Sequence, residues 1–342
     1  MAVRFVIGRA GTGKTRHALR AMVDDMRAQP VGKPIWWILP KQATFSAERE
    51  LACSSGLAAF SRARVVSFDE LGREVLQECR GGAVPEITAL GRQMLLGHLL
   101  RKLGPELRFF TGVARQPGLA ARLDATFAEF DRCGKDAETL EHLVGELRTS
   151  GRDDLETSLL ADKVSDFHVL YRAYRAALGS ERVDPHRRLE QVLACVHESK
   201  LVRDSTVYVD AFLEFSEVER EMLVALAQSS ARMEIALLID PESPTVADVH
   251  RLPAEESLFY RIEETYRRLV LSFAEAGVGM DEPVKLSEVK RFAQPALARI
   301  ERGMFDSHVS TAADRNIRPS EERCASLAVE FVEAMDRRGE VN

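Results

Sequence analysis

Short runs of apolar residues near the start of the chain alternate with segments whose apolar residues recur at helical spacing. The runs cover residues 3–7, 35–39 and 65–66. Segment 35–39 is apolar without interruption, which is typical of a strand buried on both faces. Its Trp36 and Trp37 are therefore expected in the core. Because strands and helices alternate within 80 residues, the pattern predicts a parallel β-sheet covered by helices.

The strand pattern stops after the first quarter of the chain and returns later. In between, apolar residues recur at the spacing of helices, as in Leu170, Tyr171 and Tyr174. Strand-like runs reappear at residues 206–209 and 235–239. The sequence therefore predicts three parts: an α/β core at residues 1–85 and 205–310, an all-helical insertion at residues 86–204, and a linker with the start of a second core domain at residues 311–342.

Two serine–glutamate pairs mark expected helix starts. Ser67 with Glu70, and Ser216 with Glu219, have the spacing of a capping box. In that motif the serine side chain accepts from the glutamate backbone N–H, and the glutamate side chain accepts from the serine backbone N–H. Helices are expected directly after both serines.

One segment predicts a phosphate-binding loop. Residues 8–15 match the pattern G-x-x-x-x-G-K-[ST] and lie between the first strand and the first helix. Glycines allow positive φ and a close backbone approach, so successive N–H groups can point at phosphate oxygens. Lys14 is expected to reach the β- and γ-phosphates of ATP, and Thr15 to hold Mg²⁺. The predicted nucleotide-binding residues here are Gly8, Arg9, Ala10, Gly11, Thr12, Gly13, Lys14 and Thr15.

A phosphate-binding loop needs an acidic partner at the end of a neighbouring strand. Asp210 follows the apolar run at residues 206–209 and is the best candidate for holding Mg²⁺ together with Thr15. Asp240 also ends a strand-like run, but the following Pro241 is equally consistent with a turn. Asp240 therefore ranks second.

Composition narrows the class of protein without identifying it. The 342 residues carry 47 Lys and Arg against 53 Asp and Glu, but residues 1–80 hold 13 basic and 8 acidic residues. A basic lobe on an acidic chain can still bind phosphate locally. The five cysteines are scattered and form no C-x-x-C pair, which argues against a disulfide framework or a zinc site. No signal peptide and no membrane-spanning run is recognisable, so a cytoplasmic location is expected.

Taken together, these motifs resemble the N-terminal region of the AddB/RexB family. The loop motif alone is generic to many ATPases, whereas an ordered set of motifs around a long helical insertion is specific. The resemblance covers most of the chain. The matching segments are residues 4–15, 38–45 with Glu48, Glu50 and Leu51, 65–71, 159–163, 208–212 with Phe215 and Glu219, 258–260, and 265–269.

The resemblance implies the B component of an ATP-dependent helicase/nuclease that processes DNA double-strand breaks for recombinational repair. The implied fold is an α/β P-loop NTPase with a superfamily 1 helicase-like parallel sheet and a large all-helical insertion. The implied partners are DNA and a separate AddA-like subunit that supplies the motor in a heterodimer. Family members are much longer, and their C-terminal part carries a nuclease domain and a 4Fe-4S cluster. This chain is therefore expected to be an N-terminal fragment without motor or nuclease activity.

The resemblance also suggests particular residues. It makes Asp210 the acidic residue of the nucleotide site, but Ala211 stands where hydrolysing relatives of the helicase branch place a glutamate. ATP binding with little or no turnover is expected, and no catalytic residue is assigned. Lys41, Thr44 and Phe45 follow the second strand, where related helicases contact single-stranded DNA, so they are candidate DNA-binding residues. Packing of Phe45 in the core is equally compatible with the sequence.

Two other functions remain open from the sequence. A stand-alone P-loop phosphotransferase, such as a small-molecule kinase, would need an acceptor-binding or lid arginine pair that the sequence does not identify. A non-enzymatic scaffold with a vestigial loop would not bind nucleotide. Nucleotide affinity separates the scaffold from the other two functions, and DNA affinity separates the kinase from the helicase-like subunit.

Overall fold

The computed structural model describes residues 2–54, 56, 59–82, 85–149, 155–179, 183–291 and 297. Its centre is a parallel sheet with the strand order β3-β2-β4-β5-β1-β6, and β7 also pairs with β1. The predicted parallel sheet covered by helices is confirmed. The strands are β1 (Ala2–Gly8), β2 (Ile35–Ile38), β3 (Ala63–Val66), β4 (Thr206–Val209), β5 (Arg232–Leu237), β6 (Gly279–Met280) and β7 (Val284–Leu286).

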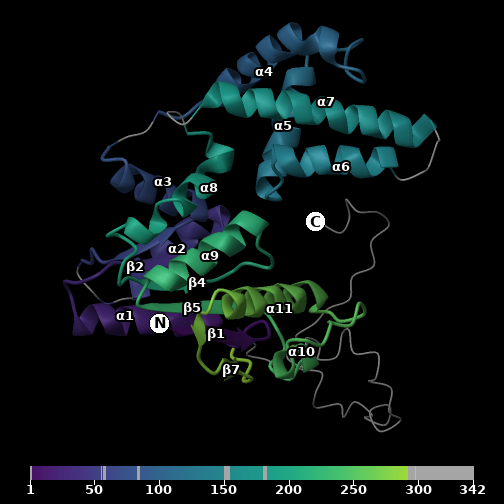
Figure 1. Cartoon of the computed structure of the whole chain (residues 1–342). Coiled ribbons are helices and arrows are strands. Elements are labelled where there is room, and N and C mark those ends of the chain that lie inside the picture. Colours follow the sequence, from purple (N-terminus) through teal and green to yellow (C-terminus); the bar gives the residue numbers. More distant parts are fainter. Residues whose placement is uncertain are drawn as a thin grey trace, which may run out of the picture.

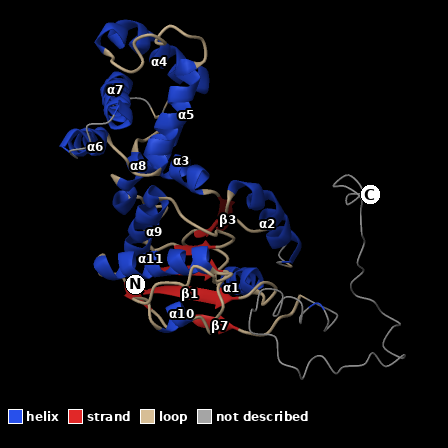
Figure 2. Ribbon diagram, turned by 90° about the vertical axis from the view of Figure 1, so that its right-hand side faces the viewer, coloured by secondary structure: helices blue, strands red, loops and turns tan. Residues whose placement is uncertain are grey.

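Helices cover both faces of this sheet because its strands are apolar on both sides (Figure 2). Helices α1 (Lys14–Ala28) and α2 (Lys41–Ser54) pack on the face that contains Trp37. Helices α3 (Phe68–Cys79), α9 (Glu217–Ser229) and α11 (Tyr260–Glu275) pack on the face that contains Trp36. Both tryptophans are fully buried, as the sequence predicts.

Four of the described helices between β3 and β4 form a separate hydrophobic cluster, which lies beyond one end of the sheet in Figure 1. Those four are α4 (Ala89–Leu103), α5 (Leu119–Arg132), α6 (Ala137–Thr149) and α7 (Leu155–Leu178). The chain enters and leaves this part side by side, with a parallel bridge between Glu86 and Val183. The following α8 (Arg188–Leu193) contributes Val192 to the cluster around the sheet. The boundary at residue 204 stays a prediction.

The helix starts follow the expected chemistry. At Ser67 and again at Ser216 the serine Oγ accepts from the backbone N–H three residues on, and the glutamate carboxylate accepts from the serine N–H. Both predicted capping boxes are confirmed. The remaining short elements are α10 (Pro244–Ala247) and the 3₁₀ turns η1 (Gly104–Glu106), η2 (Pro185–Arg187) and η3 (Val196–Glu198).

The expected linker and second core domain at residues 311–342 lie outside the described residues. Among the residues that are described, no helix combines the length and the apolar composition that crossing a membrane requires.

Candidate functional site

The segment from the last residue of β1 to the start of α1 (residues 8–13), called the β1–α1 loop below, lies at the carboxyl ends of the strands, where ligands bind in open α/β folds. Gly11 and Gly13 have φ values of 78° and 94°, in the region that favours glycine. Gly8 faces a different constraint, because a Cβ built on it would lie 2.6 Å from the backbone oxygen of Leu286. The local structure therefore favours glycine over any other residue type at each of these three positions.

Thr15 and Asp210 meet beside this loop although 195 residues separate them in the sequence. The Thr15 hydroxyl donates to Asp210 Oδ2 at 2.6 Å, and the backbone N–H of Ala211 donates to Asp210 Oδ1 at 2.7 Å. The Asp210 carboxyl is almost fully buried, and this burial raises its pKa, while the two hydrogen bonds and nearby Lys14 oppose the shift. Thr15 itself is exposed.

Lys14 folds back onto the loop that precedes it. Its Nζ donates to the backbone oxygens of Gly8 at 2.7 Å and Arg9 at 2.9 Å. Burial lowers the pKa of the Lys14 amine, and the negative charge of Asp210 opposes that shift. The amine thus lies at the centre of the loop, within the electrostatic range of the buried carboxyl.

Asp240 has a different set of contacts. Its Oδ2 accepts from Arg9 Nη1 at 3.0 Å, and its Oδ1 accepts from the backbone N–H of Glu242 at 2.9 Å. The Arg9 guanidinium also lies over the ring of Phe259, 5.4 Å from its centroid. Asp240 therefore combines the turn interaction with an ion pair to the β1–α1 loop. The sequence pattern gives no sign of this pairing with Arg9.

The loop and the side chains of Thr15 and Asp210 offer groups of the kind that bind an anion and a cation side by side. Backbone N–H groups of a glycine-rich loop before a helix bind phosphate, and hydroxyl and carboxylate oxygens are the ligands that Mg²⁺ prefers. Within the described ranges, no group of three or more His, Cys, Asp or Glu side chains is placed to hold a metal. Thr15 and Asp210 fit a Mg²⁺ that also takes oxygens from a bound nucleotide.

The candidate DNA-binding residues lie in the first two turns of α2 rather than in a loop. The helix begins at Lys41, and the Thr44 hydroxyl donates to the Lys41 backbone oxygen at 2.9 Å. Phe45 is 76% exposed. The alternative that Phe45 packs in the core is therefore wrong, and an exposed aromatic ring beside a lysine stays available for a ligand.

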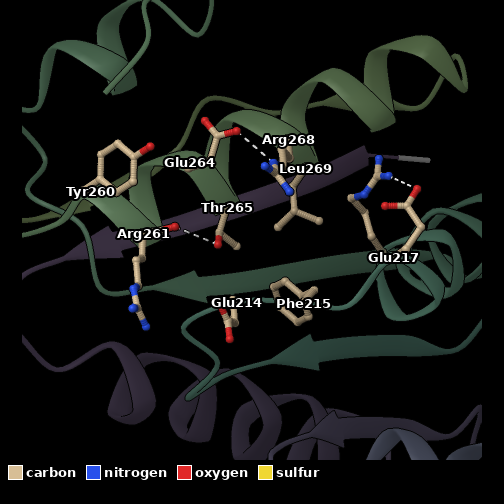
Figure 3. Close-up of a pocket in the computed structure, with 10 residues that line it drawn as sticks. Glu214, Phe215, Glu217, Tyr260, Arg261, Glu264, Thr265, Arg268 and Leu269 are labelled. Atoms are coloured by element: carbon tan, nitrogen blue, oxygen red, sulfur yellow. Dashed lines mark hydrogen bonds and ion pairs between the residues drawn. The ribbon is translucent and has the colours of Figure 1, made fainter. Parts of the chain in front are cut away.

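Sequence reasoning missed a cavity of about 260 Å³ between the start of α9 and α11 (Figure 3). Its charged side chains are largely paired with one another. Glu264 accepts from Arg268 Nε at 2.8 Å, and hydrogen bonds from Arg267 and Arg268 lower the Glu264 pKa to about 2. No sequence signal locates this cavity, because its walls come from helix faces with ordinary charge patterns. The lining residues are Glu214, Phe215, Glu217, Arg220, Tyr260, Arg261, Glu264, Thr265, Arg268 and Leu269.

Comparison with known proteins adds a line of evidence that is independent of the geometry. A family model described as "ADDB, N-terminal" matches residues 5–301. Relatives from Pelotomaculum thermopropionicum and Desulforudis audaxviator, both named as the B component of an ATP-dependent helicase/deoxyribonuclease, are each 36% identical over 89% of this chain. A protein of the same name from Symbiobacterium thermophilum is 34% identical over 99% of it.

The matched region is a small part of those relatives. It covers 26%, 25% and 28% of their respective lengths, so the chain spans about a quarter of the proteins that it resembles. The family match nevertheless extends over most of this chain, from within β1 to beyond β7. The chain belongs to the AddB N-terminal family.

Proposed function

We propose that this chain is an ATP-binding, helicase-like module with a P-loop NTPase core. The observation that carries the proposal is the hydrogen bond between Thr15 and Asp210 across the β1–α1 loop. These are the two side chains that P-loop proteins use to hold the Mg²⁺ of a nucleoside triphosphate. Their meeting at 2.6 Å, at the carboxyl edge of a parallel sheet, supports a built site over a chance sequence match.

The proposed site binds ATP with slow or negligible turnover. Hydrolysis needs a group that orients water for attack on the γ-phosphate. Ala211 follows Asp210 and has no polar side chain, and its φ of 67° turns the backbone away from the strand. Glu214, the next carboxylate along the chain, lines the cavity between α9 and α11. The nucleotide then stabilises the core without driving a motor.

The cellular role is proposed from the name that the relatives carry. That name describes one component of an ATP-dependent helicase/deoxyribonuclease, which implies a partner subunit and DNA as the substrate. We propose that this chain contributes DNA binding to such a complex in the cytoplasm, during double-strand break repair. The partner would be an AddA-like helicase subunit. Helicase and nuclease activity are not expected from this chain alone.

Calorimetry with Mg²⁺ and a non-hydrolysable ATP analogue tests the nucleotide site. Lys14→Ala should abolish measurable binding, because the lysine would contact the β- and γ-phosphates. Lys33→Ala is a matched control. Lys33 lies just before the amino end of β2, away from the loop at the carboxyl ends of the strands, and pairs with Asp204 at 3.4 Å. A phosphate-release assay on the same preparations measures turnover. Absence of binding to the unmodified chain would contradict the proposal.

A non-enzymatic scaffold with a vestigial loop is the second candidate function. The contacts of Lys14 favour it, because both hydrogen bonds of the amine go to backbone oxygens of the loop itself. A nucleotide must displace or share these bonds. If calorimetry detects no nucleotide while the chain still binds DNA or a partner subunit, the scaffold is the better description.

A further inference from the structure

The chain that follows α11 returns to the β1–α1 loop and packs against it. Strand β7 pairs in parallel with β1, with Leu286 opposite Gly8. Beyond β7, the backbone N–H of Lys290 donates to the backbone oxygen of Gly11 at 2.9 Å. Residues 286–291, called the cover segment below, thus contact the loop at two separated points.

Two glycines of the loop lie so close to the cover segment that a side chain at either position would collide with it. A Cβ on Gly8 would lie 2.6 Å from the backbone oxygen of Leu286, and a Cβ on Gly11 would lie 2.5 Å from the Cβ of Arg291. A Cβ on Gly13, by contrast, would meet nothing within 4 Å. The glycines at positions 8 and 11 are therefore needed for packing against the cover segment, in addition to any approach of a phosphate.

The cover segment also forms one wall of a cavity beside the loop. This cavity has a volume of about 340 Å³, and Leu286 and Lys290 line it together with Thr12 and Gly13. The wall opposite comes from the first turns of α1, including Arg16. A ligand in the loop would therefore lie next to the cover segment as well as next to α1.

We infer that the cover segment is a positioning element for the nucleotide loop, with the Lys290 backbone N–H as its main contact. This inference rests on the proposed function and names a second part of the same site. Gly11 has a positive φ, which a free glycine loop adopts only as one of many conformations. The hydrogen bond from Lys290 selects that conformation before a nucleotide arrives, so less ordering remains for binding to accomplish.

Coupling between the cover segment and a bound nucleotide must act in both directions. If the cover segment favours the loop conformation that binds nucleotide, then bound nucleotide must stabilise the cover segment by the same factor. Nucleotide occupancy is thereby transmitted to the chain after β7, which lies far from the loop motif in sequence order. A segment that is not coupled to the loop and does not touch the ligand would show the same dynamics with and without nucleotide.

The first experiment compares two substitutions at one position. Lys290→Ala removes the side chain and keeps the N–H, whereas Lys290→Pro removes both. Calorimetry with Mg²⁺ and a non-hydrolysable ATP analogue should give a dissociation constant about five-fold larger for the proline variant than for the alanine variant. That factor corresponds to about one net hydrogen bond. Circular dichroism without nucleotide checks that both variants are folded.

The second experiment needs no substitution in the cover segment. Hydrogen–deuterium exchange of residues 286–291 is measured with and without the saturating analogue, and with Lys14→Ala as the variant that cannot bind. Slower exchange of this segment on binding, absent in Lys14→Ala, supports the inference. Unchanged exchange in a chain that calorimetry shows to bind nucleotide overturns it and leaves the proposed function intact. No nucleotide binding by the unmodified chain overturns both.

Discussion

At the scale of single residues, burial changes the chemistry of both charged groups in the candidate site. It raises the pKa of Asp210 and lowers the pKa of Lys14, and each charge partly opposes the shift of the other. Each of the two groups is therefore easier to neutralise than the same residue in water. A bound Mg²⁺ and a triphosphate would oppose both pKa shifts, because each charge would then have a partner.

This pairing predicts a pH optimum for nucleotide binding. As the pH falls toward the raised pKa of Asp210, the carboxyl gains a proton and loses its hold on Mg²⁺. As the pH rises toward the lowered pKa of Lys14, the amine loses the charge that attracts phosphate. Calorimetric affinity for the Mg²⁺-bound analogue should therefore fall on both sides. Asp210→Asn should remove the acid side of the profile, and the same acid side in that variant would contradict the assignment.

Asp131, in α5, gives a prediction about stability instead of binding. It is 2% exposed and accepts a hydrogen bond from the Tyr171 hydroxyl of α7. Burial raises the Asp131 pKa to about 6. Because the folded pKa exceeds the unfolded value of about 3.9, the folded state binds the extra proton. The protonated Asp131 carboxyl therefore makes its full contribution to the free energy of unfolding below about pH 4. This contribution disappears as the pH rises through about 6.

Asp131→Asn should isolate this effect. Between about pH 4 and pH 7, the free energy of unfolding of the unmodified chain should fall by about 2 kcal/mol relative to the asparagine variant. Urea denaturation at each pH measures the difference, and all other titrating groups are common to the two proteins. If the two proteins differ by the same free energy of unfolding at both pH values, Asp131 is ionised in the folded chain with an ordinary pKa.

At the scale of helices and strands, the capping boxes show local sequence acting on local structure. The Ser216 Oγ accepts from the backbone N–H of Glu219 at 3.3 Å, which satisfies one of the free donors at the start of α9. Ser216→Ala should lower the free energy of unfolding by about 1 kcal/mol. Urea denaturation checks this value.

Ser46→Ala is the matched control for that helix start. Ser46 is an exposed position within α2, and alanine is a better helix former there. Its substitution should change the free energy of unfolding by less than about 0.5 kcal/mol. If Ser216→Ala has an effect as small as Ser46→Ala, the cap does not stabilise α9.

Strands and helices differ in how far the sequence predicts them. The strands with continuous apolar runs and the capped helices follow from periodicity and cap chemistry. Strands β6 and β7 do not, since they have two and three residues and exist because β1 offers them an edge. The start of α2 at Lys41 also has no capping residue before it, so the sequence alone favours a loop there.

The candidate site divides in the same way. Motif spacing predicts residues 8–15, and the end of an apolar strand predicts Asp210. The contacts of Gly8 and Gly11 with residues 286–291 could not be predicted, because they are made by a backbone oxygen, a backbone N–H and a Cβ atom. Any residue type other than proline could supply the N–H. Sequence patterns carry little information about contacts of this kind.

At the scale of the whole molecule, the hydrophobic cluster of the helical part is separate from the two clusters on the faces of the sheet, and polar contacts lie where the two parts meet. The helical part packs around residues such as Tyr171, whereas the core packs around the sheet. Between them Arg188 is 2% exposed and donates to Glu86 at 2.7 Å and to Asp69. The buried Arg188 therefore links α8 to α3 and to the segment that leads into the helical part.

Charge is also distributed unevenly over the molecule, and this leads to a prediction about DNA. The chain is acidic overall, but residues 1–80 are basic and present Lys41 and Phe45 together on α2. Binding of single-stranded DNA should therefore be weak and steeply dependent on salt. Lys41→Ala should reduce the slope of log affinity against log salt by about one, because one phosphate contact is lost.

Phe45→Ala should lower the affinity for single-stranded DNA by about 1–3 kcal/mol through the loss of base stacking. Because the ring is 76% exposed, the same substitution should leave the melting temperature unchanged. Fluorescence anisotropy with a labelled oligonucleotide at several salt concentrations measures the affinity, and thermal denaturation followed by circular dichroism measures the melting temperature. Val31→Ala is the control for an exposed apolar side chain, and Lys33→Ala is the control for a lost charge, since both lie at the opposite edge of the sheet. Equal losses from test and control variants would place the DNA contact elsewhere, with the helical part as the next surface to test.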